Sequence, residues 1–149
     1  MTSNYHIMMI NIRGLKNKID SIRDYIKRNK IHIAIFLETW LDPKDRIKGL
    51  HNIILDIREN AQRKLSRLAT GRARSGDGIL VWAKTDVPIK KIKETDYYGV
   101  IKIQETIIVI TYLPPRLPIE RVAGIMKEIN EIAASTTEVI IMGDFNSRI

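Results

Sequence analysis

The sequence contains no cysteine, which excludes a disulfide framework, a thiolate zinc site and a cysteine nucleophile and fits an intracellular, reducing setting. It also lacks any run approaching about 18 consecutive apolar residues, so we expect no membrane-spanning helix. The stretch from Met1 to Asn11 has no basic segment followed by a long apolar one, so we expect no secretory signal. Histidine is limited to His6, His32 and His51, and no histidine cluster is available for a soft metal.

The chain is basic and has enough apolar residues for a core. Its 149 residues and 44% hydrophobic content are typical of one domain. The net charge of +8 and the pI near 9.8 indicate a polyanionic partner. No obligate protein partner can be inferred from the composition.

Apolar periodicity predicts a layered α/β (α+β) fold. Two amphipathic helices are expected at residues 17–29 and 118–134; their core-facing stripes are Ile19, Ile22 and Ile26 in the first and Ile119, Val122, Met126, Ile129 and Ala133 in the second. A strand, a helix and a strand open the chain, which favours a βαβ unit, and the later consecutive strands favour an antiparallel meander. The expected strands are residues 5–12, 31–37, 52–57, 79–83, 86–93, 98–103, 107–111 and 138–142.

Four of the apolar runs end in polar residues. These residues are Asn11, Glu38, Tyr112 and the pair Asp144 and Asn146. Any one of them could be an ordinary turn residue, because turns favour polar side chains. Taken together they indicate one site, since α/β sheets place their chemistry at strand ends. Carboxylate and amide oxygens suit Mg²⁺, and a cation would offset the roughly 3 kcal/mol repulsion of two carboxylates about 5 Å apart at an effective dielectric near 20.

Several motifs in this order resemble the endonuclease/exonuclease/phosphatase superfamily, and most closely the apurinic-like endonuclease domain of non-LTR retrotransposons. The matching pieces are Ile10-Asn11-Ile12-Arg13-Gly14-Leu15, Leu37-Glu38-Thr39-Trp40-Leu41, Gly76-Asp77-Gly78-Ile79-Leu80-Val81, Thr111-Tyr112-Leu113-Pro114-Pro115 and Gly143-Asp144-Phe145-Asn146. The resemblance implies a two-sheet β-sandwich flanked by helices and incomplete at its C-terminus. Residues 1–149 would be roughly the N-terminal three-fifths of that domain, with the family's closing Asp-His pair beyond Ile149.

The resemblance also implies a role for each strand-end residue. Glu38 matches the family's metal-binding glutamate, with Mg²⁺ as cofactor and Mn²⁺ as a possible substitute. Asn11 is expected to position the metal-bound phosphate, and Asp144 to orient or activate the attacking water. Asn146 is expected to hydrogen-bond the phosphate or Asp144, and Tyr112 to stabilise developing charge near the scissile phosphate.

A basic segment between Arg58 and Arg74 carries six cations against one acid, Glu59. One interpretation of this segment is a solvated, flexible loop. Beside a phosphodiesterase site, contact with the DNA phosphate backbone is favoured, and we expect an exposed loop on the side of that site. The predicted nucleic-acid-binding residues are Arg58, Arg63, Lys64, Arg67, Arg72 and Arg74.

The function these observations predict is Mg²⁺-dependent phosphodiester hydrolysis, in a DNA-nicking endonuclease of a retroelement or its remnant. Such a protein is expected to be intracellular, and nuclear if it belongs to a retroelement. Two alternatives stay open: a phosphatase of the same superfamily, and a truncated, inactive fragment that at most binds nucleic acid.

Overall fold

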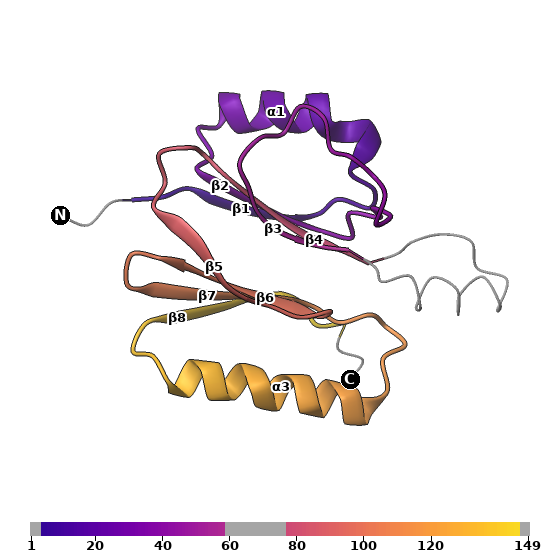
Figure 1. Cartoon of the computed structure of the whole chain (residues 1–149), viewed down its shortest axis with the longest axis vertical. Helices are drawn as coiled ribbons and strands as arrows, with labels where there is room; N and C mark the ends of the chain where they lie inside the picture. Colours follow the sequence, from indigo (N-terminus) through magenta and orange to yellow (C-terminus); the bar gives the residue numbers. More distant parts are fainter. Residues whose placement is uncertain (1–3, 59–76, 147–149) are drawn as a thin grey trace, which may run out of the picture.

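The first of two sheets is built from the N-terminal half of the chain. In the computed structural model, which describes residues 4–58 and 77–146, its strands follow the order β1-β2-β4-β3 (Figure 1). Strand β1 runs parallel to β2, and β4 is antiparallel to both β2 and β3. The bounds are Ile7–Asn11 for β1, Ile33–Leu37 for β2, Ile53–Ile57 for β3 and Ile79–Ala83 for β4.

The second sheet has the order β5-β6-β7-β8. Strands β5, β6 and β7 form the expected antiparallel meander, whereas β8 returns parallel to β7 through helix α3. The bounds are Ile89–Glu94 for β5, Tyr98–Ile103 for β6, Thr106–Tyr112 for β7, Ile119–Ala134 for α3 and Val139–Asp144 for β8.

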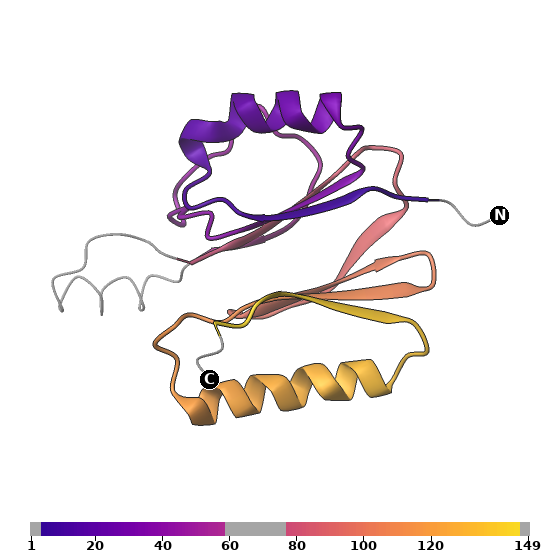
Figure 2. The same ribbon diagram turned by 180° about the vertical axis from the view of Figure 1, so that it is seen from behind.

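Each sheet carries a helix on its outer face, so the layers run helix, sheet, sheet, helix (Figures 1 and 2). The 3-10 helix η1 (Lys16–Lys18) leads into α1 (Ile19–Arg28), which buries Ile22 and Ile26 against the first sheet. Helix α3 buries Ile125 and Ile129 against the second. The expectation that Ile119 lies in the core is wrong: it is the first residue of α3 and is 78% exposed.

The two sheets pack face to face through a continuous apolar layer, here called the inter-sheet core. Most of its β-branched residues come from the central strands β2, β4, β6 and β7, which are covered on both faces and therefore carry long apolar runs. The expected two-sheet sandwich flanked by helices is therefore confirmed. The members of the inter-sheet core are Ile33, Ile35, Leu37, Leu55, Ile57, Ile79, Val81, Ala83, Val87, Ile101, Ile103, Ile108, Ile110 and Tyr112.

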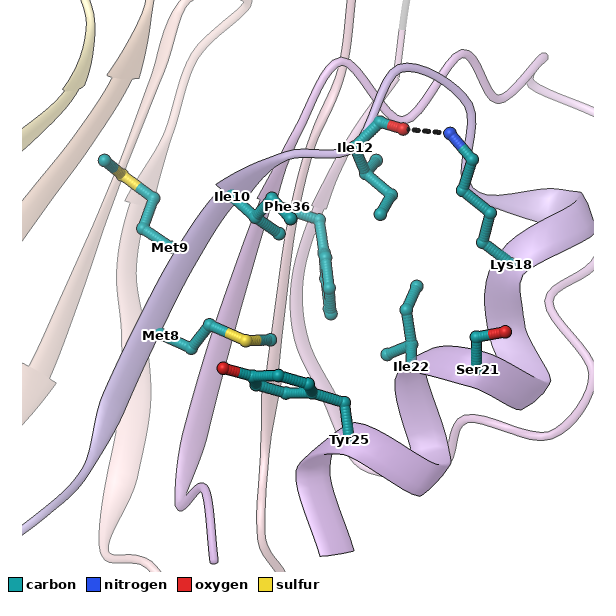
Figure 3. A pocket seen from close by; sticks show the side chains of 9 residues that line it. All are labelled: Met8, Met9, Ile10, Ile12, Lys18, Ser21, Ile22, Tyr25 and Phe36. Carbon is teal, nitrogen blue, oxygen red and sulfur yellow. Dashed lines mark hydrogen bonds between the residues drawn. The ribbon is translucent and has the colours of Figure 1, made fainter. Parts of the chain in front are cut away.

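Strands β1 and β8 each lie at one edge of their sheet. Apolar side chains remain accessible there, with Ile10 42% and Ile140 45% exposed. A hollow of about 400 Å³ opens between β1 and α1, lined by Met8, Ile22 and other mostly apolar side chains (Figure 3).

Among the helices of the described residues, none has the length and apolarity that crossing a bilayer requires.

Candidate active site

Asn11 and Glu38 meet at the carboxyl ends of neighbouring parallel strands. Asn11 pairs with Leu37 in the β1–β2 ladder, which places Glu38 one residue beyond the pair. The Asn11 side-chain amide donates a hydrogen bond to Glu38 Oε2. Parallel strands end at the same edge of a sheet, so this contact follows directly from the βαβ opening.

The loops that follow these two strands stay hydrogen-bonded to each other past the end of the ladder. Gly14 N donates to Glu38 O at 2.9 Å, and Leu15 N donates to Thr39 O at 3.0 Å. Lys18 Nζ donates to Ile12 O (Figure 3), which ties the first loop down to the start of α1. The backbone around Glu38 is therefore held from one side by the β1–η1 loop.

The start of β4 holds the Glu38 loop from its other side. Glu38 N donates to Gly78 O at 2.9 Å, and Trp40 N donates to Asp77 O at 3.1 Å. These bonds fix an unusual backbone, because Glu38 and Trp40 adopt φ values of +55° and +56°. Left-handed conformations cost non-glycine residues about 1–3 kcal/mol and cluster at functional sites. The surroundings of Glu38 therefore carry the strain expected of a functional loop.

Tyr112, Asp144 and Asn146 form a second group at the ends of β7 and β8. Tyr112 and Asp144 are direct partners in the parallel ladder, and Leu113 N donates to Asp144 O at 2.9 Å. Asn146 N donates to Asp144 Oδ1 at 3.0 Å, and its side-chain amide donates to Leu113 O at 2.6 Å. Tyr112 is buried at the end of the inter-sheet core. The backbone donor at Asn146 holds the Asp144 carboxylate in one orientation.

Gly143 allows β8 to approach β7 closely enough for this arrangement. Its φ is +152°, and a Cβ placed there would lie 1.9 Å from the backbone oxygen of Thr111. A backbone atom in a central strand cannot move away as a flexible side chain would. Only glycine fits this position, immediately before Asp144.

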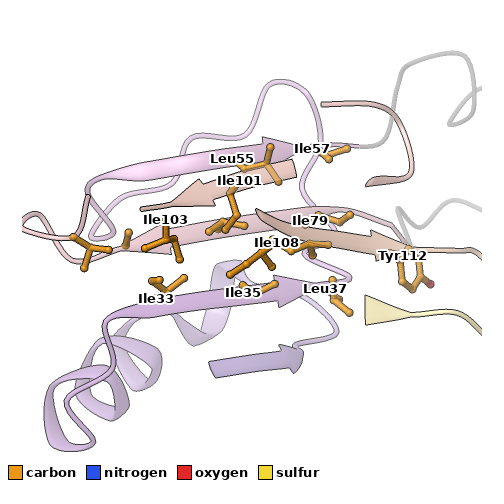
Figure 4. Close-up of a cluster of buried hydrophobic side chains, with 14 residues drawn as sticks. Ile33, Ile35, Leu37, Leu55, Ile57, Ile79, Ile101, Ile103, Ile108 and Tyr112 are labelled. Carbon is orange, nitrogen blue, oxygen red and sulfur yellow. The ribbon is translucent and has the colours of Figure 1, made fainter. Parts of the chain in front are cut away.

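The two groups belong to different sheets but to the same end of the sandwich. Leu37, next to Glu38, and Tyr112 both lie at that end of the inter-sheet core (Figure 4). The structure thus brings Asn11 into contact with Glu38. It places Tyr112 and Asn146 beside Asp144 at the ends of β7 and β8. Within residues 4–58 and 77–146, no group of three or more acidic or histidine side chains is arranged to hold a metal ion.

Arg58 is the one member of the predicted basic set that lies within the described residues. Its guanidinium pairs with the Asp56 carboxylate at 3.0 Å. It also donates to the backbone oxygens of Asp42, at 2.8 Å, and of Asp45, so it links β3 to the loop that follows the Glu38 segment. The other predicted members, Arg63, Lys64, Arg67, Arg72 and Arg74, lie outside the described residues.

The structure adds polar neighbours that the strand-end pattern did not single out. Thr39 and Asp77 are 1% and 5% exposed, and both lie in the segments bonded to Glu38. Thr39 packs so closely against Gly78 that a Cβ there would lie 2.1 Å from its hydroxyl oxygen. Their positions in the sequence could have indicated them, because Thr39 directly follows Glu38 and Asp77 precedes Gly78, the residue before β4.

Comparison with protein families and solved structures identifies the family and the fold of the chain. A model described as the endonuclease/exonuclease/phosphatase family matches residues 10–149. No curated protein sequence matches the chain. The endonuclease domain of TRAS1, a telomere-specific non-LTR retrotransposon, superposes with a TM-score of 0.65 at 17% identity, over 98% of this chain and 61% of that one.

Two further structures share the fold. The 3′ phosphatase NExo from Neisseria, bound to product DNA hairpin, gives a TM-score of 0.65 at 12% identity, over 96% of this chain and 58% of that chain. An AP endonuclease from Archaeoglobus fulgidus gives 0.57 at 15% identity, with the same two coverages of 96% and 58%. The chain thus spans about three-fifths of the length of these structures. From the family model and the shared fold, the chain belongs to the endonuclease/exonuclease/phosphatase family.

Proposed function

We propose that the chain provides the metal-dependent phosphodiester-cleaving site of a DNA-nicking endonuclease from a retroelement or its remnant. The observation that carries the proposal is the contact between Asn11 and Glu38 at one end of the sandwich, the end that also bears Tyr112 and Asp144. The family includes nucleases and phosphatases, and the solved structures with this fold include a retrotransposon endonuclease domain and a DNA-bound phosphatase. DNA is therefore the substrate class best supported.

The residues around Glu38 fit a hard divalent cation. Mg²⁺ is commonly bound by one or two carboxylates, with water and substrate phosphate completing its shell. Glu38 supplies a carboxylate, and Asn11 Oδ1 is buried without a hydrogen-bond donor from the described residues. A buried, unpaired carbonyl oxygen costs about 1–3 kcal/mol, which a cation or its bound water would offset. Mn²⁺ accepts the same oxygen ligands.

When bound, the cation neutralises charge on the phosphoryl group and on the leaving oxygen. Asp144 orients the attacking water and accepts its proton. Its backbone partner at Asn146 holds the carboxylate in place during that transfer. Tyr112 presents its phenol to the phosphate, where a hydroxyl donor stabilises developing negative charge.

A supercoiled-plasmid nicking assay tests the proposal. The substitution Glu38→Gln keeps the size of the side chain but removes its charge, so we expect a loss of at least about 10²-fold in Mg²⁺-dependent nicking. The matched control is Glu105→Gln, an exposed glutamate in the β6–β7 turn, at the opposite end of β7 from Tyr112. Both substitutions are tested in the 149-residue chain and in any longer protein that is translated when the reading frame continues past Ile149. Equal nicking by both variants would overturn the assignment.

A phosphatase of the same family is the second candidate function. The fold shared with the NExo 3′ phosphatase favours it. Release of inorganic phosphate from a 3′-phosphorylated oligonucleotide, without strand cleavage, would identify this activity. DNA binding without either reaction, in both the 149-residue and the extended product, would identify a protein that only binds nucleic acid.

A further inference from the structure

The shared sheet edge places Asn11 and Glu38 side by side, but strand alternation would direct their side chains to opposite faces. Phe36 of β2 and Ile12 after β1 pack with α1 (Figure 3). Leu37, the ladder partner of Asn11, packs against the second sheet (Figure 4). Because successive side chains of a strand alternate between faces, a regular continuation of β2 would turn Glu38 towards α1. The observed contact of Glu38 with Asn11 therefore requires a break in this alternation.

One extra residue after β2 supplies that break. Glu38 N bonds to Gly78 O, and Trp40 N bonds to Asp77 O. A regular antiparallel ladder advances two residues on both strands between successive bonds of this kind. Here the β2 side advances two residues and the β4 side only one, so the β2 side carries an inserted residue, as in a β-bulge. Bulges of this kind redirect a side chain beside an active site, and Thr39 is the inserted residue here.

The side chain of Thr39 lies in a slot that only a glycine at position 78 leaves open. Thr39 is 1% exposed, and a Cβ on Gly78 would lie 2.1 Å from Thr39 Oγ1. On the opposite side, Thr39 O accepts a hydrogen bond from Leu15 N at 3.0 Å. The residues before and after Thr39 both have left-handed φ values, which this double contact maintains.

We propose that Thr39 is a positioning residue, whose side chain, seated over Gly78, holds the bulge in place and keeps the Glu38 carboxylate directed at Asn11. The shape of Thr39 carries this role, because its hydroxyl has no hydrogen-bond partner within residues 4–58 and 77–146. A β-branched side chain has few χ1 rotamers and fills the slot in one orientation. The inference rests on the proposed function only for the cation that Glu38 binds.

Mn²⁺ binding, followed by EPR on the 149-residue protein, tests the role of Thr39. Thr39→Ala empties the slot and Gly78→Ala obstructs it, so each should weaken Mn²⁺ binding by about 10-fold or more. Thr39→Val keeps the branched shape and should retain the parental affinity. Where Thr39→Ala does not fold, Thr39→Ser, which lacks only the methyl branch, takes its place with the same expected direction.

The control for a general loss of stability is Ile110→Ala, in the core of the other sheet. It should leave Mn²⁺ affinity unchanged under conditions in which its urea unfolding curve shows a folded protein. A weakening by Ile110→Ala as large as that by Thr39→Ala would overturn the inference.

The Asn11 side-chain amide gives a second reading that needs no metal. In the parent it donates to Glu38 Oε2, so its NMR signals should show protection from exchange with solvent. Thr39→Ala should remove this protection and Thr39→Val should preserve it. Unchanged Asn11 signals in Thr39→Ala overturn the inference, whatever the metal result. Parental Mn²⁺ affinity in Glu38→Gln refutes the metal site of the proposed function instead, and the Asn11 signals then decide the role of Thr39.

Discussion

Replacing Gly143 with alanine should be among the most destabilising single-methyl changes in this chain. The new Cβ would lie 1.9 Å from Thr111 O and 2.8 Å from Thr111 C, both backbone atoms of a central strand. Overpacking of this kind costs about 1–3 kcal/mol. The positive φ adds about 1–2 kcal/mol for an L-residue. Loss of the bond from Leu113 N to Asp144 O adds about 1 kcal/mol, so the total is roughly 3–6 kcal/mol.

Equilibrium urea unfolding measures this loss, and Gly124→Ala is its matched control. Gly124 lies inside α3, and a Cβ there would meet nothing within 4 Å, so alanine should stabilise the protein by about 1 kcal/mol. The two Gly→Ala changes are thus expected to shift the urea midpoint in opposite directions. A Gly143→Ala protein within about 0.5 kcal/mol of the parent would refute the argument that β8 requires glycine before Asp144.

Three further predictions use the same unfolding measurement. Ile110→Ala, in the inter-sheet core, should lower the free energy of unfolding by about 2–5 kcal/mol, and a loss below 1 kcal/mol would contradict the tight packing assigned to that layer. Asn146→Gly keeps a positive φ but removes the amide bonded to Leu113 O, so it should cost about 1 kcal/mol, and no loss would mean that this bond is not formed in solution. Burial raises the pKa of Asp45, but hydrogen bonds from Lys16 and from the Asp42 backbone outweigh it and lower the pKa below 3.8. The stabilisation by ionised Asp45 is therefore fully present above pH 3.8 and is lost as the pH falls through the lowered pKa. Asp45→Asn should lower the free energy of unfolding by at most about 1 kcal/mol at pH 7 and by less at pH 3. A loss that does not depend on pH would contradict the pairing of Asp45 with Lys16.

Most elements of the fold could be predicted because their apolar periodicity is unambiguous. The stripe of α1 and the β-branched runs of β2 and β7 mark elements packed in a core. The sequence did not reveal how the strands divide between the two sheets, because β-branched runs carry no partner information. Residues 79–83 enter the first sheet between β2 and β3, whereas residues 89–94 start the second sheet. This division depends on the packing of the two sheets against each other, which is a long-range property.

The candidate site was predictable at its strand ends and less so in its loops. Asn11 and Glu38 are in contact as expected, because parallel neighbouring strands end together. The left-handed backbone of Arg13 and Trp40 in the loops beside them was not foreseen. Neither residue type favours that conformation, so local propensity gives no warning of it. It occurs in loops that long-range backbone hydrogen bonds tie together.

The division of the candidate site between two sheets has a consequence for how its activity can be tuned. Glu38 and Asp144 belong to separate hydrogen-bonded ladders, so the thickness of the apolar layer between the sheets sets their spacing. Sandwich layers are about 10 Å thick, and a change of one methylene group in such a layer shifts one face relative to the other. For the proposed cleavage, selection for faster or slower turnover should therefore recover substitutions at the site end of this layer, near Leu37 and Tyr112, as readily as substitutions of the polar groups.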